Sequence, residues 1–121
     1  MLEDEKLTYK IRGCIYEVYR ELGAGFLEKV YENALEIELS KQGLKVEKQH
    51  SLSVSYKNNI VGEFVADLLV EGRIILELKA VNKLLPLHEA QLLNYLKVTN
   101  MKLGLLVNFS YPKATVRRII L

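Results

Sequence analysis

The sequence predicts an α/β domain in which helices flank a mixed β-sheet, in the order ααβββαββ. Three features predict this class. Two amphipathic helical stretches come first, an antiparallel meander of strands follows, and a helical stretch then separates two apolar strands near the C-terminus. The last arrangement predicts one parallel βαβ crossover, which we expect to be right-handed. A chain of 121 residues suits one hydrophobic core, so we expect a single domain over residues 1–121.

Two helices are expected before the sheet. Residues 4–22 and 26–42 place apolar side chains at steps of three and four, which is the spacing of one helix face. Gly23 and Gly43 follow these stretches and predict where the helices end. The side chains expected to face the core are Leu7, Ile11, Cys14, Ile15, Val18 and Leu22 in the first helix, and Leu27, Val30, Ala34, Leu35 and Leu39 in the second.

Five strands and a third helix follow. Alternating polar and apolar residues predict a half-exposed first strand, and Lys57-Asn58-Asn59 predicts a hairpin turn after it. The fourth strand is apolar throughout, so we expect it to be buried on both faces. The helix before it starts at about Leu84 or Leu87, is entered at Pro86 and ends at Thr99. The strands are expected over residues 46–56, 60–70, 73–80, 103–109 and 115–121.

Composition narrows the class of protein. No apolar run approaches about 18 residues, and the acidic N-terminus lacks the apolar core of a signal peptide, so we expect neither a membrane span nor secretion. The single cysteine, Cys14, indicates a buried thiol in a reducing compartment and favours a cytoplasmic protein. A net charge of +2 does not by itself require a nucleic-acid partner. Basic residues that could contact a nucleic-acid backbone, but are more often solvated, are Lys97, Lys102, Lys113, Arg117 and Arg118.

Residues 67–79 place two acids and a lysine among the apolar residues of two adjoining strands. Burying an ionised group in such a strand costs free energy unless the group is paired or binds a metal. Asp67, Glu77 and Lys79 therefore suit an active site better than a packed core. Because side chains alternate faces along a strand, Glu77 and Lys79 share one face. The competing interpretation is that the acids lie on the surface in salt bridges with Lys79 or Arg73.

The turn between these strands decides whether Asp67 joins the other two residues. A two-residue loop, Glu71-Gly72, would set Asp67 opposite Leu76 and on the wrong face. A three-residue loop, Glu71-Gly72-Arg73 with its second or third residue left-handed, would set Asp67 directly opposite Glu77, and a bulge elsewhere would do the same. We therefore expect a loop with an odd number of residues, or a bulge.

The pattern Asp67…Glu77-x-Lys79 resembles the PD-(D/E)XK nuclease superfamily, whose motif is an Asp on one strand and Glu/Asp-x-Lys on the next. The resemblance implies a restriction-endonuclease-like core. Further segments resemble, in order and at similar spacing, the small bacterial and archaeal GxxExxR proteins, which are placed in the same superfamily. Gly25-x-x-Glu28 is here followed by Tyr31. The segments that carry the likeness are Gly23–Leu35, Glu77–Val81, Pro86–Lys97 and Gly104–Phe109.

Asp67 and Glu77 are the expected metal ligands. Two carboxylates a few ångströms apart repel each other, and a hard divalent ion such as Mg²⁺ or Mn²⁺ removes that conflict. The resemblance implies that the Leu78 carbonyl is a further metal ligand. Lys79 is expected to orient the attacking water or to stabilise charge that develops on the phosphate. Donors of this kind are typically worth roughly 3 kcal/mol in the barrier.

The resemblance also implies one acidic or histidine side chain at the site from the helix before the sheet. Glu28 and Glu32 lie four residues apart, about one turn, on one side of the second helix. Glu28, just after the glycine corner, is the better candidate, although the helix dipole alone also favours a carboxylate there. Tyr31, between them, is expected in the core. Glu17-x-x-Arg20 in the first helix is a second partial match to the family label.

Gln91 and Tyr95 on the third helix match the Q-x-x-x-Y element of RecB-type nucleases, which implies positions beside the metal or the scissile phosphate. An amide and a phenol are good neutral donors to a phosphate. The competing interpretation is a polar flank beside the leucine core stripe of this helix. His88 lies on the same stripe, but a histidine at a helix start is more often a cap or a surface residue.

The sequence thus predicts a divalent-metal-dependent phosphodiester hydrolase. The resemblance implies DNA as the substrate. A domain this small offers little surface for sequence recognition, so we expect a homodimer or a helper subunit. The alternative is a catalytically inactive nuclease fold that binds nucleic acid or a protein partner. A more remote one is a metal-dependent hydrolase of a smaller phosphodiester.

Overall fold

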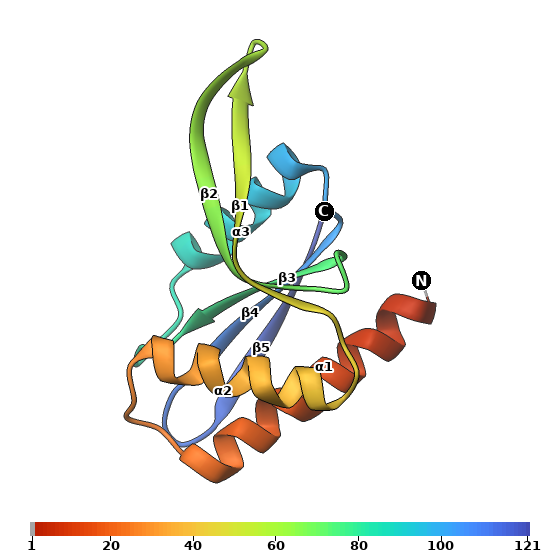
Figure 1. The fold of residues 1–121 in the computed structure, drawn as a ribbon. Coiled ribbons are helices and arrows are strands. Elements are labelled where there is room, and N and C mark those ends of the chain that lie inside the picture. The colour runs from red at the N-terminus through yellow and green to blue at the C-terminus, as the bar shows by residue number, and fades with distance from the viewer. Residues whose placement is uncertain (1) are drawn as a thin grey trace.

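The computed structural model describes the backbone of residues 2–121 and the side chains from residue 4 onward. The elements follow the predicted order, and helices flank a mixed five-stranded sheet (Figure 1). Within residues 2–121, none of the helices combines the length and the apolar character needed to cross a bilayer. The elements are α1 (Leu2–Leu22), α2 (Glu28–Lys41), β1 (Val46–Tyr56), β2 (Asn59–Val70), β3 (Ile74–Lys79), α3 (Pro86–Thr99), β4 (Leu103–Phe109) and β5 (Ala114–Ile120).

The five strands lie side by side in chain order, from β1 at one edge to β5 at the other. β3 and β4 are parallel, whereas the other three neighbouring pairs are antiparallel. α3 connects β3 to β4, so the predicted parallel crossover is confirmed. α1 and α2 pack on one face of the sheet, and α3 packs on the other (Figure 1).

Each face of the sheet has its own hydrophobic core. Alternation along β3 sends Ile74, Leu76 and Leu78 toward α1 and α2, while Ile75 faces α3. Every residue of β4 is buried, which confirms the prediction of a strand covered on both faces. Cys14 of α1 is buried as predicted, and burial raises the pKa of its thiol to about 11.

The inward face of α2 differs from the prediction. Leu27 and Val30 are 81% and 38% exposed, so the core positions predicted for them are wrong. The helix begins only at Glu28, and its rotation is set by Tyr31 and by the buried leucines that follow at four-residue steps. Tyr31 is fully buried, as predicted, and its hydroxyl donates to the Gly23 carbonyl at 2.6 Å. The helix is thereby tied to the glycine corner that precedes it.

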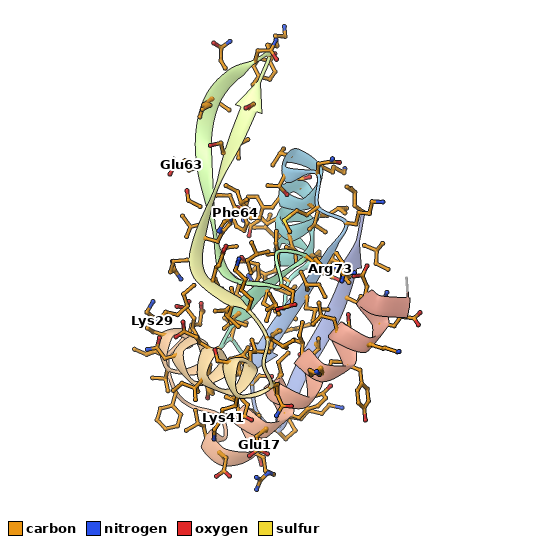
Figure 2. The ribbon with its side chains drawn as sticks, turned by 45° about the vertical axis from the view of Figure 1, so that its right-hand side comes forward. Glu17, Lys29, Lys41, Glu63, Phe64 and Arg73 are labelled. Atoms are coloured by element: carbon orange, nitrogen blue, oxygen red, sulfur yellow. The ribbon has the colours of Figure 1, made fainter. Side chains whose placement is uncertain are left out.

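β1 and β2 form a hairpin that extends far beyond the rest of the sheet (Figure 1). β2 pairs with β3 only over Leu68–Val70, but it pairs with β1 over almost its whole length. Beyond this point the hairpin packs against α3, where the rings of Phe64 and Tyr95 stack with centroids 3.5 Å apart; Figure 2 labels Phe64 on the hairpin. The strands β2 and β3 therefore separate just at Asp67.

Candidate active site

The turn between β2 and β3 contains three residues, as predicted. Val70 pairs with Ile74, and Glu71, Gly72 and Arg73 lie between them. Gly72 is left-handed, with φ 63°, which is one of the two alternatives considered. Arg73 is not left-handed, and Glu71 is, with φ 56°. The turn therefore gives the register that the active-site prediction requires.

The β2–β3 ladder ends at the pair Leu68–Leu76, and the same register continued by one residue sets Asp67 opposite Glu77. Side chains replace the main-chain ladder there. The Leu78 N–H donates to Asp67 Oδ2 at 2.8 Å, and the Asp67 N–H lies 3.4 Å from Glu77 Oε1 as a weak donor. Each acid thus accepts a hydrogen bond from the opposite strand, and the two carboxylates are held together where the strands separate.

Both strand acids are electrostatically disfavoured in their charged form. Burial raises the pKa of Glu77 to about 8, and the neighbouring Asp67 carboxylate contributes to the rise. Burial also raises the pKa of Asp67, and the charges of Glu32 and Glu28 add to that effect. The positive charge of Lys79 opposes the shift at both acids. The pair is therefore a place where added positive charge would be stabilised.

The salt-bridge interpretation of these acids is not supported. Arg73 pairs with Asp4 of α1, and Figure 2 shows it on the side of the molecule opposite Lys29 at the start of α2. Among the side chains from residue 4 onward, Lys79 forms no ion pair with any acid. Lys79 is half-buried and follows Glu77 by two residues on the same face of β3.

The helix acids Glu28 and Glu32 both lie near the strand acids, but in different settings. Glu32 is 4% exposed, and its carboxylate accepts hydrogen bonds from Gln49 Nε2 at 2.7 Å and from Lys29 Nζ at 2.9 Å. Glu28 is exposed, and its charge raises the pKa of both strand acids. Glu28 is therefore the helix acid whose carboxylate is open to a ligand.

Gln49 is a residue of this region that the sequence reasoning missed. It lies on β1 between two residues whose partners flank Asp67 on β2, so it sits across from Asp67. Its φ of 52° is left-handed, which costs a non-glycine residue about 1 kcal/mol or more. The available sequence signal was the polar run 47–51, which interrupts the alternation of the strand.

No hydrogen bond or ion pair joins Gln91 or Tyr95 of α3 to the strand acids in the described part of the chain. Gln91 is exposed, and the half-buried Tyr95 stacks on Phe64. α3 does pack on the sheet face that carries Ile75, which alternation makes the face of Glu77 and Lys79. His88 Nδ1 accepts a hydrogen bond from the Leu85 N–H at 3.1 Å, which confirms that His88 caps the helix.

Asn108 is a second residue that the sequence reasoning missed, because β4 was taken as apolar throughout. It is 2% exposed and pairs with Lys79 in the sheet register. Its Oδ1 accepts the Val81 N–H at 3.0 Å, and its Nδ2 donates to the Val81 carbonyl at 2.9 Å. The amide thus holds the chain where it leaves β3, two residues after Lys79. A lone Asn in an apolar strand was the available signal.

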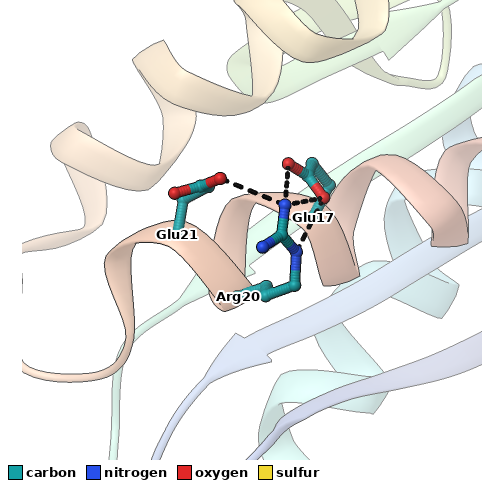
Figure 3. Close-up of polar contacts among 3 residues, drawn as sticks. All are labelled: Glu17, Arg20 and Glu21. Atoms are coloured by element: carbon teal, nitrogen blue, oxygen red, sulfur yellow. Dashed lines mark hydrogen bonds and ion pairs between the residues drawn. The ribbon is translucent and has the colours of Figure 1, made fainter.

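Other charged residues are engaged with each other outside this region. Arg20 of α1 contacts both Glu17 carboxylate oxygens and Glu21 on the exposed side of the helix (Figure 3). This pairing accounts for the Glu17-x-x-Arg20 match without a role at the strand acids. Arg117 of β5 pairs with Glu89 of α3 at 2.9 Å. Its charge is thus already paired within the protein.

The donor atoms at the strand acids fit a small, hard divalent ion that keeps part of its water shell. Among the residues with described side chains, no group of three or more His, Cys, Asp or Glu is arranged to hold a metal by itself. Mg²⁺ usually binds through one or two carboxylates and retains several waters. The Asp67 and Glu77 carboxylates and the Leu78 carbonyl suit that mode of binding. The raised pKa values of the two acids indicate why a cation would be favoured there.

Comparison with known proteins agrees with this geometry. The family model of the PD-(D/E)XK nuclease superfamily matches residues 5–119. The chain therefore belongs to the PD-(D/E)XK nuclease superfamily. No curated protein matches it. A solved structure described as "Crystal structure of SSO0001" is 19% identical, with a TM-score of 0.60 over 77% of this chain, and this chain spans half the length of that one. That likeness shows the fold, and together with the family match it confirms the predicted restriction-endonuclease-like class.

Proposed function

We propose that this protein is a divalent-metal-dependent phosphodiester hydrolase that cleaves DNA. The observation that carries the proposal is the pair of half-buried carboxylates, Asp67 and Glu77, joined across the separating strands and followed by a lysine without an ion-pair partner among the described side chains. Superfamily membership supports nuclease activity. A binding module would not need two half-buried acids with raised pKa values.

In this proposal Asp67, Glu77 and the Leu78 carbonyl hold Mg²⁺ or Mn²⁺, and Glu28 joins them from α2, with Glu32 as the alternative helix ligand. The bound ion would lower the pKa of a water and polarise the phosphate. The Leu78 N–H fixes the Asp67 carboxylate at 2.8 Å. The Asp67 carboxylate is therefore held in a fixed orientation in which to bind the ion.

Lys79 and two residues of α3 act on the substrate. The Lys79 ammonium is not committed to an acid of the described chain, so it orients the water or stabilises charge on the phosphate. The Asn108 amide fixes the backbone just beyond it. Gln91 and Tyr95 position the nucleic-acid backbone from α3, which packs on the sheet face of Glu77 and Lys79.

Cleavage assays with plasmid, linear and single-stranded DNA and with RNA, in Mg²⁺, Mn²⁺ or EDTA, test the proposal. Metal-dependent cleavage should fall by roughly 10²–10³-fold in Lys79→Ala. Lys41→Ala, an exposed lysine at the end of α2, should cleave like the wild type. Mn²⁺ titration calorimetry should give heat for the wild type and for Lys79→Ala, but not for Asp67→Asn.

Absence of both metal-binding heat and cleavage in folded wild-type protein would overturn the proposal. Tight DNA or protein binding in that case would favour the inactive nuclease-fold module. We also propose a cytoplasmic homodimer, or a complex with a helper subunit, in which a second chain supplies recognition surface. Light scattering on the purified protein tests the homodimer.

A further inference from the structure

A hollow of about 360 Å³ lies beside the candidate active site. Its walls come from the α1–α2 corner (residues 24–27), from the chain after β3 (residues 80–82) and from the chain after β4 (residues 109–111). Figure 1 shows the corner and the loop after β4 at the same end of the molecule, next to the end of β3. The hollow adjoins the site along the chain, because Leu27 directly precedes Glu28 and Ala80 directly follows Lys79.

Two exposed aromatic rings border this hollow. Phe26 is 45% exposed and Tyr111 is 84% exposed. Phe26 is nevertheless braced, because its ring meets Tyr31 edge-on at 6.1 Å, and Tyr31 in turn stacks on Phe109 at 4.3 Å. A ring that is held in place but leaves much of its surface open is a preformed stacking surface.

The chemistry of the walls selects the occupant. Of the described residues that line the hollow, none is charged. A phosphate would therefore find no compensating cation there, and it would lie close to the acidic Glu28. The hollow instead offers two aromatic rings, together with the Asn82 amide and the Ser110 hydroxyl as hydrogen-bonding groups. These features suit a flat, uncharged, aromatic ligand with polar edges.

We propose that the hollow holds an unpaired nucleobase of the strand to be cleaved, stacked against the rings of both Phe26 and Tyr111. The inference rests on the proposed nuclease function and adds its substrate class, namely single-stranded or frayed DNA ends. A base inside a duplex is stacked and paired, so it reaches such a hollow only after leaving the helix. Stacking on an aromatic ring tolerates any base, because each has a π-face.

Binding of fluorescent oligonucleotides in EDTA, where metal-dependent cleavage is blocked, tests the inference. Phe26→Ala and Tyr111→Ala should each bind single-stranded DNA roughly tenfold more weakly, and their duplex binding should stay at the wild-type level. Tyr9→Ala is the matched control, because Tyr9 is an 82% exposed aromatic residue on α1, outside the hollow. Phe26→Tyr should retain wild-type affinity.

A stacking readout separates base binding from a general loss of structure. The fluorescence of a 2-aminopurine base in the oligonucleotide should be quenched on binding to the wild type and to Tyr9→Ala, but not to Tyr111→Ala. The 84% exposed Tyr111 can be removed with little effect on folding, which circular dichroism checks.

The two proposals can fail separately. Metal-dependent cleavage that depends on Lys79, together with unchanged single-strand binding in both aromatic variants, would overturn the base site and leave the nuclease standing. Equal weakening of duplex and single-strand binding would also overturn the base site. Wild-type protein that quenches 2-aminopurine but cleaves no nucleic acid in any metal would overturn the nuclease proposal, and with it the assignment of the base to a strand that is cleaved.

Discussion

Charged side chains are paired at the turn end of the β2–β3 pair, whereas at the open end two acids lie side by side. At the turn, Arg73 pairs with Asp4, and the Glu71 carboxylate accepts the Lys45 N–H at 2.6 Å. At the open end, Asp67 and Glu77 lie together, and burial raises the pKa of both. Charges at the turn stabilise the folded state, whereas the charged forms of the two acids at the open end destabilise it unless a cation is bound. Within the same two strands, charges that stabilise the fold by pairing thus lie only a few residues from acids that need a cation.

Matched removal of one charge at each end is expected to give the largest effect. Glu77→Gln should abolish both metal-dependent cleavage and Mn²⁺ binding, because it removes one of the two carboxylates at the strand junction. Glu71→Gln should leave both intact, because its carboxylate only caps the Lys45 N–H at the turn. Cleavage rates and titration calorimetry on the two variants check this. Equal loss in both variants would erase the distinction between the ends.

The pH dependence of stability in EDTA should differ between the wild type and Glu77→Gln. The folded pKa of Glu77 is about 8 against an ordinary value of 4.5, so the folded state holds a proton that the unfolded state releases between these values. Unfolding free energy should therefore fall as pH rises through this window. Each pKa unit corresponds to about 1.4 kcal/mol.

Glu77→Gln removes this dependence. The free energy of unfolding of Glu77→Gln should therefore equal that of the wild type at about pH 4.5, and it should exceed that of the wild type by the largest amount at about pH 8. Urea unfolding at several pH values measures the difference. Glu5→Gln, an exposed acid of α1, is the control and should track the wild type. A constant offset between Glu77→Gln and wild type across the window would contradict the raised pKa.

The sequence predicted the register of β2 and β3 at Asp67, because the requirement that Asp67 and Glu77 meet called for an odd loop or a bulge, and the turn has three residues. Alternation along the strands and the helical pattern between β3 and β4 then sufficed to predict the meander and the parallel β3–β4 crossover. Local pattern did not fix the rotation of α2, because Val30 and Tyr31 are both plausible core residues. The hydrogen bond from Tyr31 to the Gly23 carbonyl decides between them.

Sequence periodicity could not predict contacts between segments that lie far apart in the chain. Gln49 reaches Glu32 across 17 positions of the chain, and Asn108 reaches Val81 across 27. Neither has a local periodicity that marks its partner. Both stood out only as polar residues that break a strand pattern, and the structure shows what each one holds.

The left-handed Gln49 allows its backbone strain to be separated from its side-chain contact. Gln49→Gly removes the amide but accepts φ 52° without strain, whereas Gln49→Ala removes the amide and keeps the strain. The glycine variant should therefore be more stable than the alanine variant, by about 1 kcal/mol. Both should bind Mn²⁺ differently from the wild type, because Glu32 loses its hydrogen bond at 2.7 Å. Equal stabilities in urea would show that the conformation carries no strain.

The smallest effect is expected at the turn. The Arg73 and Asp4 side chains are 41% and 25% exposed, so solvent screens their attraction. A double-mutant cycle with Arg73→Ala and Asp4→Ala should give a coupling of about 0–1 kcal/mol in urea unfolding. Mn²⁺ affinity and cleavage should stay at the wild-type level, because the pair lies at the far end of the strands from Glu77. A change in metal affinity would mean that the two ends are linked through the β2–β3 ladder. The Arg73–Asp4 pair at the turn would then also affect metal binding by Asp67 and Glu77.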